Sequence, residues 1–133
     1  MTDTVAALGP HECLDVLRRQ RVGRIAVTHR ALPAIVPVNY VLDCHRVVFR
    51  TRRDGLLGST CRNAVVAFEV DDIEAKGRGG LSVLVVGVAD VLEGSEQLRA
   101  LELPLVSPVA DADDVFVAVT LGSVTGRRIG VAG

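Results

Sequence analysis

Two valine-rich segments of this 133-residue chain end in side chains that could bind a phosphorylated, planar ligand. The first is Val36-Pro37-Val38-Asn39-Tyr40, and the second ends in Phe49-Arg50-Thr51. The residues between them, Asp43-Cys44-His45-Arg46, are typical of a turn, so we expect a β-hairpin. Its strands would gather an amide, a phenol, a guanidinium and a hydroxyl around one patch. Proteins use such donors to hold a phosphate and the polar edge of a heterocycle.

An ordinary structural role for these side chains is the alternative. Asn39 and Thr51 would then be polar residues at strand ends, Tyr40 would be half-buried in the core, and Arg50 would be solvated. The residues alone leave both interpretations open.

The other titratable side chains predict neither a metal site nor a general acid–base pair. The histidines are scattered, and the cysteines are odd in number and lack a C-x-x-C spacing: His11, His29, His45, Cys13, Cys44 and Cys61. The run Asp71-Asp72-Ile73-Glu74 crowds its carboxylates together and is expected to be a solvated loop. Arg127 and Arg128 have two interpretations. They could reach an anionic ligand across a dimer interface, or form ion pairs with Glu69, Asp71 or Asp72.

Composition favours a single β-rich domain spanning residues 1–133. Hydrophobic residues make up 49% of the chain and 24 of them are valines, whose β-branched side chains suit strands. A net charge of −1 and an aromatic content of 3% argue against nucleic-acid binding. The longest apolar run, Leu81 to Ala89, is too short to span a membrane, and residues 1–10 do not resemble a signal peptide. We therefore expect a soluble cytoplasmic protein with no nucleic-acid or membrane partner.

The expected secondary structure is mostly strand. Strands are expected over 21–27, 35–42, 46–51, 64–70, 81–92 and 115–121, and helices over 9–20, 56–61 and 94–101. The connecting segments are expected to be an acidic turn at 71–72, an exposed loop over 74–80, irregular chain over 104–114, and a turn plus a short strand over 125–129. Gly87 predicts a bulge or a close backbone approach. Because strands and helices do not alternate in a βαβ rhythm, the pattern predicts an antiparallel barrel with helical caps.

The long strands carry more apolar surface than one small barrel can enclose. The longest expected strands, 35–42 and 81–92, are almost entirely apolar, which predicts that both of their faces are buried. We therefore expect a homodimer in which a second subunit covers the outer face, including part of Leu81 to Leu92.

In the order of its motifs the chain resembles the pyridoxamine 5′-phosphate oxidase-like family, and in particular its short actinobacterial members. The motifs are Val-Gly-Arg-Ile-Ala, Pro-Val-Asn-Tyr, Phe-Arg-Thr, Ala-Phe-Glu-Val-Asp, Ser-Val-Leu-Val and Gly-Arg-Arg-Ile, within residues 10–130. The resemblance implies a six- to seven-stranded antiparallel split β-barrel of the FMN-binding type. It also implies a dimer with a flavin in a groove at the interface. The residues that match positions near the flavin are Pro37, Val38, Asn39, Tyr40, Phe49, Arg50 and Thr51.

The chain departs from the family pattern at the phosphate. Leu56 stands where the family usually has a lysine that neutralises the flavin phosphate. Loss of one charge-assisted contact weakens binding by about tenfold to a hundredfold. Candidates to replace that lysine are Arg50, Arg52, Arg53 and Arg62. Elsewhere in the family pattern, an aromatic and an arginine are replaced by Leu81 and Val86, and a tryptophan-rich loop is replaced by residues 105–114.

Two functions therefore stand as hypotheses. In the first, the protein is an oxidoreductase that uses FMN, or a related deazaflavin, to reduce a small organic acceptor. In the second, it is a non-catalytic dimeric module that binds a flavin, haem or another planar ligand weakly or not at all. No residue is assigned a catalytic role, because a flavin supplies the hydride chemistry itself.

Overall fold

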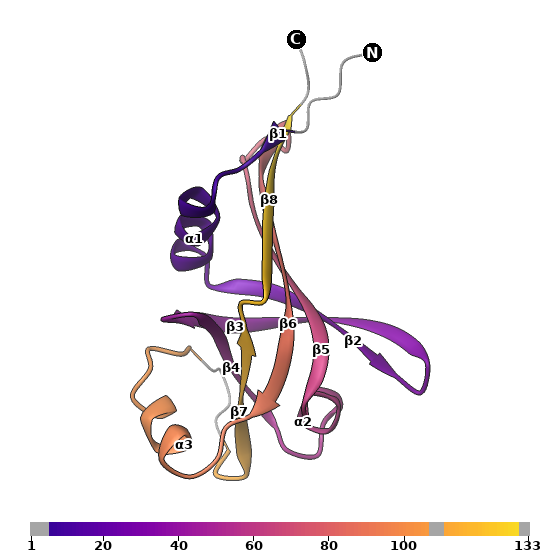
Figure 1. The fold of residues 1–133 in the computed structure, drawn as a ribbon, viewed down its shortest axis with the longest axis vertical. Coiled ribbons are helices and arrows are strands. Elements are labelled where there is room, and N and C mark those ends of the chain that lie inside the picture. Colours follow the sequence, from indigo (N-terminus) through magenta and orange to yellow (C-terminus); the bar gives the residue numbers. More distant parts are fainter. Residues whose placement is uncertain (1–5, 107–110, 131–133) are drawn as a thin grey trace.

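The protein is a six-stranded antiparallel barrel extended at one end, as seen in a computed structural model that describes residues 6–106 and 111–130 (Figure 1). One sheet has the order β1-β8-β6-β5-β2-β3-β4-β7, and pairing of β6 with β7 closes the barrel. The strands are β1 (Ala6–Ala7), β2 (Val22–His29), β3 (Leu32–Asp43), β4 (Arg46–Arg52), β5 (Ala64–Ile73), β6 (Gly79–Val91), β7 (Asp114–Thr120) and β8 (Ser123–Gly130). The helices are α1 (Pro10–Arg19), α2 (Leu56–Thr60) and α3 (Ser95–Ala100). The expected fold class, an antiparallel split barrel, is confirmed.

Strand β6 passes from one neighbour to another along its length. Residues 79–86 pair with β8, and residues 89–91 pair with β7. Gly87 lies at this change of partner, where a Cβ atom would collide with the backbone carbonyl oxygen of Thr120. The close backbone approach predicted for this glycine is thereby confirmed.

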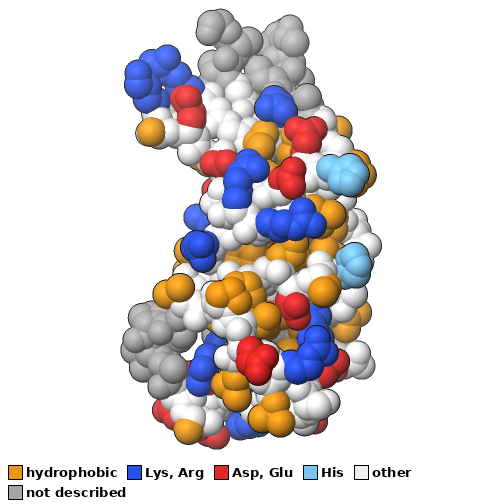
Figure 2. Space-filling view, turned by 90° about the vertical axis from the view of Figure 1, so that its left-hand side faces the viewer, with side chains coloured by type: hydrophobic (Ala, Val, Ile, Leu, Met, Phe, Trp, Pro, Cys, Tyr) orange, Lys and Arg blue, Asp and Glu red, His pale blue; other side chains and the backbone are white. Residues whose placement is uncertain are grey.

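Alternate residues of the strands fill the core, as a period of two requires. Along β6, Val83 and Val85 are fully buried, whereas Val86 and Val88 keep 37% and 44% of their surface exposed. One face of this strand is therefore not covered within a single chain. Apolar side chains are also exposed on the side of the molecule that carries α1 and α3, where they gather across the middle between groups of charged side chains (Figure 2).

Helix α1 packs against β3, β5, β6 and β8 and buries Cys13, Val16 and Leu17. Pro10 occupies its first turn, where the missing N–H is not needed, and the Glu12 carboxylate accepts the backbone N–H of Gly9. No helix in residues 6–106 or 111–130 is long and apolar enough to span a membrane.

Two expected connections are wrong. Asp71 and Asp72 belong to β5, whose ladder with β6 continues to the pair Ile73–Gly80. They tolerate strand positions because arginines neutralise them: Arg19 lies 2.9 Å from Asp72, and Arg24 lies 3.5 Å from Asp71.

The chain end differs in the same way. Residues 125–129 are part of the continuous strand β8, held by its ladder to β6, rather than a turn followed by a short strand. Of the stretch 104–114 expected to be irregular, Asp114 already begins β7, and residues 107–110 lie outside the described residues.

Candidate functional site in the split between β3 and β4

The barrel opens where β3 and β4 separate. Their ladder runs from the pair Asp43–Arg46 to the pair Tyr40–Phe49 and ends there. Beyond that point, β4 continues alongside β7, and β3 continues alongside β2. The divergence leaves a cleft between the two strands that the sequence predicted as a hairpin.

The edge of β3 that faces this cleft has backbone groups without a strand partner. The N–H of Tyr40 donates to the carbonyl of Arg21 next to β2, so the even-numbered residues of β3 point their backbone groups at β2. The odd-numbered residues point the other way, and these include Pro33 and Pro37, which have no N–H to offer a ladder. The carbonyl of Pro37 therefore points away from β2, toward the cleft.

The cleft has a volume of about 210 Å³. It is lined by Val36, Pro37, Val38, Asn39, Arg50, Thr51, Leu57, Leu105 and Val106. The structure thus brings together five residues that the sequence singled out, from Pro37 through Asn39 on β3 and Arg50 and Thr51 on β4. Pockets for whole drug-sized ligands are usually about 300–1,000 Å³. This volume alone would hold only part of such a ligand, and a neighbouring pocket of about 260 Å³ shares Asn39 and Val106 with the cleft.

Three other residues that the sequence singled out lie mainly in the core. Phe49 is completely buried, and Tyr40 is 2% exposed. The Tyr40 ring makes an edge contact with Phe68, with ring centroids 4.9 Å apart, and burial raises the pKa of its hydroxyl. Leu56 is half-buried and packs against the core, while the next residue, Leu57, lines the cleft. Contacts of Tyr40, Phe49 and Leu56 with a ligand remain predictions.

Arg50 does not extend into the cleft as an unpaired cation. Its Nε donates to the Asp114 carboxylate at 3.2 Å, and its Nη2 donates to the carbonyl oxygen of Asp111 at 3.0 Å. The guanidinium carbon also lies 5.2 Å from the centre of the Phe116 ring, within range of a cation–π contact. Aromatic, carboxylate and carbonyl groups therefore hold this arginine on three sides.

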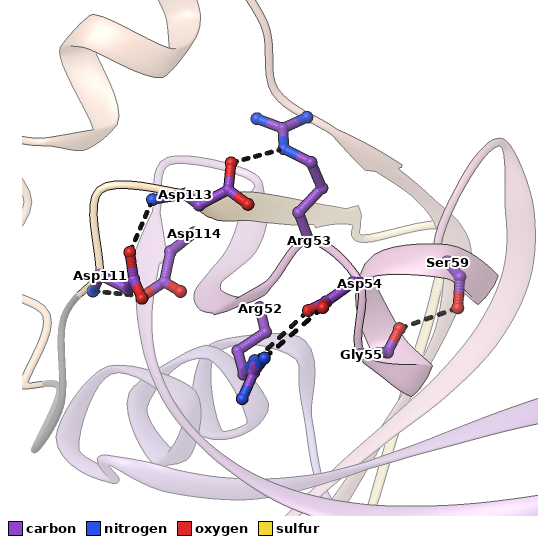
Figure 3. Close-up of polar contacts among 8 residues, drawn as sticks. All are labelled: Arg52, Arg53, Asp54, Gly55, Ser59, Asp111, Asp113 and Asp114. Atoms are coloured by element: carbon purple, nitrogen blue, oxygen red, sulfur yellow. Dashed lines mark hydrogen bonds and ion pairs between the residues drawn. The ribbon is translucent and has the colours of Figure 1, made fainter.

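The neighbouring arginines also have partners, and Figure 3 shows those of Arg52 and Arg53. Arg52 pairs with Asp54 at 3.3 Å, and Arg53 pairs with Asp113 at 3.5 Å. Arg62, two residues after the end of α2, donates its Nε to the carbonyl of Gly58 within that helix at 3.0 Å. None of the three is among the residues that line the cleft.

A second, polar cavity lies on the extension of the sheet. Glu69, Ser82, Leu84, Thr125, Gly126 and Arg127 line it, with a volume of about 280 Å³. Burial, followed by the negative charge of Asp71, raises the pKa of the Glu69 carboxyl. The Ser82 hydroxyl donates to that carboxyl at 3.1 Å, and Arg24 lies 4.0 Å away.

The two C-terminal arginines differ in their contacts. Arg128 pairs with Glu12 at 3.2 Å, a partner that neither of the two interpretations named. Arg127 has no ion pair within the described part of the chain, and its role as a ligand contact remains a prediction.

Sequence reasoning missed Asp114, Leu57 and the apolar pair Leu105 and Val106. Asp114 lies 64 residues after Arg50, and their contact depends on the register of β4 with β7. Leu57 had a usable signal, since it lies one residue after the family lysine position on a short amphipathic helix.

A family model described as pyridoxamine 5′-phosphate oxidase matches residues 10–128. The chain belongs to this family. The uncharacterized protein Rv0080 of Mycobacterium tuberculosis is 36% identical to this oxidase-family chain over 130 residues, covering 94% of this chain and 86% of that protein.

Two solved structures of flavin-binding proteins resemble this family member closely. The FAD-binding protein from Mycobacterium smegmatis has a TM-score of 0.81 and 31% identity, over 98% of this chain and 100% of that one. A FAD-binding protein from Mesorhizobium loti has a TM-score of 0.79 and 27% identity, over 93% of this chain and 97% of that one.

Proposed function

We propose that this chain is a flavin-dependent oxidoreductase that binds its cofactor in the cleft between β3 and β4 and reduces a small organic acceptor. The observation that carries the proposal is the split itself. It exposes one backbone edge of β3 beside an amide, a hydroxyl and apolar side chains. The FAD-binding relatives with the same fold support a flavin, and FMN, FAD and a deazaflavin share the tricyclic ring that such a cleft would receive.

The donors and acceptors around the cleft suit the edge of a flavin ring. The Pro37 carbonyl accepts an N–H, the Asn39 amide offers both a donor and an acceptor, and the Thr51 hydroxyl does the same. Val36, Val38 and Leu57 supply apolar contacts. A bound flavin would supply the hydride and electron transfer, so this chain's residues need only bind the ring, orient it and exclude water.

The second part of the proposal is that the functional unit is a homodimer. Across the outer face of the sheet, Ile35, Ala26, Ala67 and Val86 are successive neighbours on β3, β2, β5 and β6, and Val65 pairs with Val88 beside them. Ile35 and Val65 are each 72% exposed in the single chain. A second copy of the chain would cover this surface and enlarge the cleft of about 210 Å³ to the size of a flavin.

Spectroscopy tests the proposal directly. Titration of the purified protein with FMN and FAD should quench flavin fluorescence to a saturating value and shift the visible absorption bands. Val38→Phe fills the cleft and should weaken the binding of both flavins by about tenfold or more, because the added side chain would occupy the space of the flavin ring. Leu98→Phe adds the same ring at a 66% exposed position on α3 and serves as the control. Equal affinity in both variants would place the flavin elsewhere.

The paired state of Arg50 and the apolar Leu56 favour a second candidate, a non-catalytic module that binds flavin, haem or another planar ligand weakly. Electron transfer from reduced nicotinamide to menadione separates the two functions. An oxidoreductase should accelerate this transfer above the rate of free flavin at the same concentration. A module would bind the flavin without acceleration, and a Soret band after addition of haem would identify haem as its ligand.

A further inference from the structure

We propose that Asp114 sets the ligand specificity of the cleft by neutralising Arg50. The cleft then recognises the ring and the hydroxylated chain of a flavin, and it does not select for a terminal phosphate. This inference rests on the proposed function, because it concerns which flavins the cleft accepts. It differs from the phosphate-binding role that the sequence suggests for the Arg50 guanidinium.

The pair is built into the barrel wall. The side chains of Arg50 and Asp114 are 21% and 7% exposed, and their N–O distance is 3.2 Å. Arg50 lies opposite Phe116 in the β4–β7 ladder, two residues along from Asp114, so the guanidinium runs back over the ring to reach the carboxylate. Strand register, rather than a flexible surface contact, therefore holds the two charges together.

A turn fixes the carboxylate independently of Arg50. The N–H of Asp111 donates to Asp114 Oδ2 at 3.1 Å, and the N–H of Asp114 donates to the carbonyl of Asp111 at 3.0 Å. That same carbonyl accepts Arg50 Nη2. Turning Arg50 toward a phosphate would strip a nearly buried carboxylate of its counter-charge, which is strongly unfavourable. A phosphate must therefore compete with an anion that is already in position.

No other cation compensates within the described lining of the cleft. Arg50 is the one charged side chain among the described residues that line it. Leu56 and Leu57 stand where α2 begins, and Arg52 and Arg53 are paired with carboxylates. Selection would then depend on Asn39, Thr51 and the apolar wall, which could contact only groups that phosphorylated and unphosphorylated flavins share.

Riboflavin and FMN form a matched pair of probes, because they differ only in the terminal phosphate. Their dissociation constants should be measured by fluorescence titration at low salt for the wild type, Asp114→Asn and the double variant Arg50→Gln/Asp114→Asn. Glu93→Gln, which neutralises an exposed carboxylate outside the lining of the cleft, is the control. Thermal unfolding of each variant shows whether it is folded at the temperature of the titration.

The wild type and Glu93→Gln should bind the two flavins with similar affinity. Asp114→Asn should favour FMN over riboflavin by about tenfold or more, because it leaves the guanidinium charge available to the phosphate. The double variant should abolish that preference. If the wild type already prefers FMN by tenfold, or if folded Asp114→Asn shows no gain, the inference is wrong while the proposed function stands.

The ratio of the wild-type dissociation constants for riboflavin and FMN tests the inference even if Asp114→Asn does not fold. Addition of inorganic phosphate to wild-type protein should then leave riboflavin affinity unchanged and should not displace FMN. Displacement of FMN by phosphate would show that the cleft holds an anion and would overturn the inference. If neither flavin binds any folded variant, the proposed function fails, and the inference fails with it.

Discussion

The Tyr40 hydroxyl donates a 2.6 Å hydrogen bond to the backbone carbonyl oxygen of Leu17. This carbonyl lies in the last turn of α1, where helix carbonyls lack partners within the helix. Tyr40 therefore ties the helix to β3 at the rung where the β3–β4 ladder ends. The residue that the sequence offered as a ligand contact acts as a link between the helix and the mouth of the split.

Tyr40→Phe should lower the free energy of unfolding by about 1–2 kcal/mol, because it leaves a buried carbonyl without a donor while keeping the ring contact with Phe68. Urea denaturation measures this loss. Flavin affinity should be unchanged. Weaker flavin binding with unchanged stability would instead show that the hydroxyl contacts the ligand.

Leu56→Lys should tighten FMN by about tenfold or more, because it restores one charge-assisted contact at the family lysine position. Wild-type protein, which lacks that contact, should be purified largely colourless. Ser59→Lys adds the same charge at an exposed position on the same helix and should have little effect on FMN affinity. Tight FMN binding by the wild type, with no gain from the lysine, would mean that another group already replaces this contact.

Light scattering at micromolar concentration should give twice the chain mass of 14.1 kDa. An obligate interface of this kind should bury about 2,000 Å² or more. Val86→Asp, on the outer face of β6, should shift the mass toward that of one chain, because it places an unpaired charge in the interface. Leu98→Asp on α3 is the control and should leave the dimer intact. A wild-type mass of a single chain would contradict the proposed dimer.

Glu69 should make the protein less stable as pH rises. Burial and the charge of Asp71 raise the pKa of its carboxyl above the ordinary value of 4.5. The folded state therefore holds a proton that the unfolded state has lost, so stability falls as pH rises from 4.5 through the raised value. Glu69→Gln should flatten this part of the profile of melting temperature against pH, whereas the exposed control Glu93→Gln should not. If Glu69→Gln leaves the dependence of melting temperature on pH unchanged, the raised pKa of Glu69 is contradicted.

The sequence by itself determined strands β3 and β4 and the hairpin that joins them. Valine alternation and the turn around Cys44 are local signals, because residues two apart in a strand share a face whatever the rest of the chain does. The same local signals placed Pro37, Val38, Asn39, Arg50 and Thr51 near one another, and the cleft brings them together. Local patterns failed at Asp71 and Asp72, which look like a turn until arginines from α1 and β2 neutralise them.

The tertiary structure alone decided what those side chains face. Closure of the barrel brings β7 beside β4 and gives Arg50 the Asp114 carboxylate as a partner. The packing of α1 gives the Tyr40 hydroxyl the carbonyl of Leu17. Both contacts join residues far apart in sequence, and a shift of one residue in strand register would turn these side chains to the opposite face. Residue types and spacing define which groups can bind, but the register between distant strands determines which of them already have a partner.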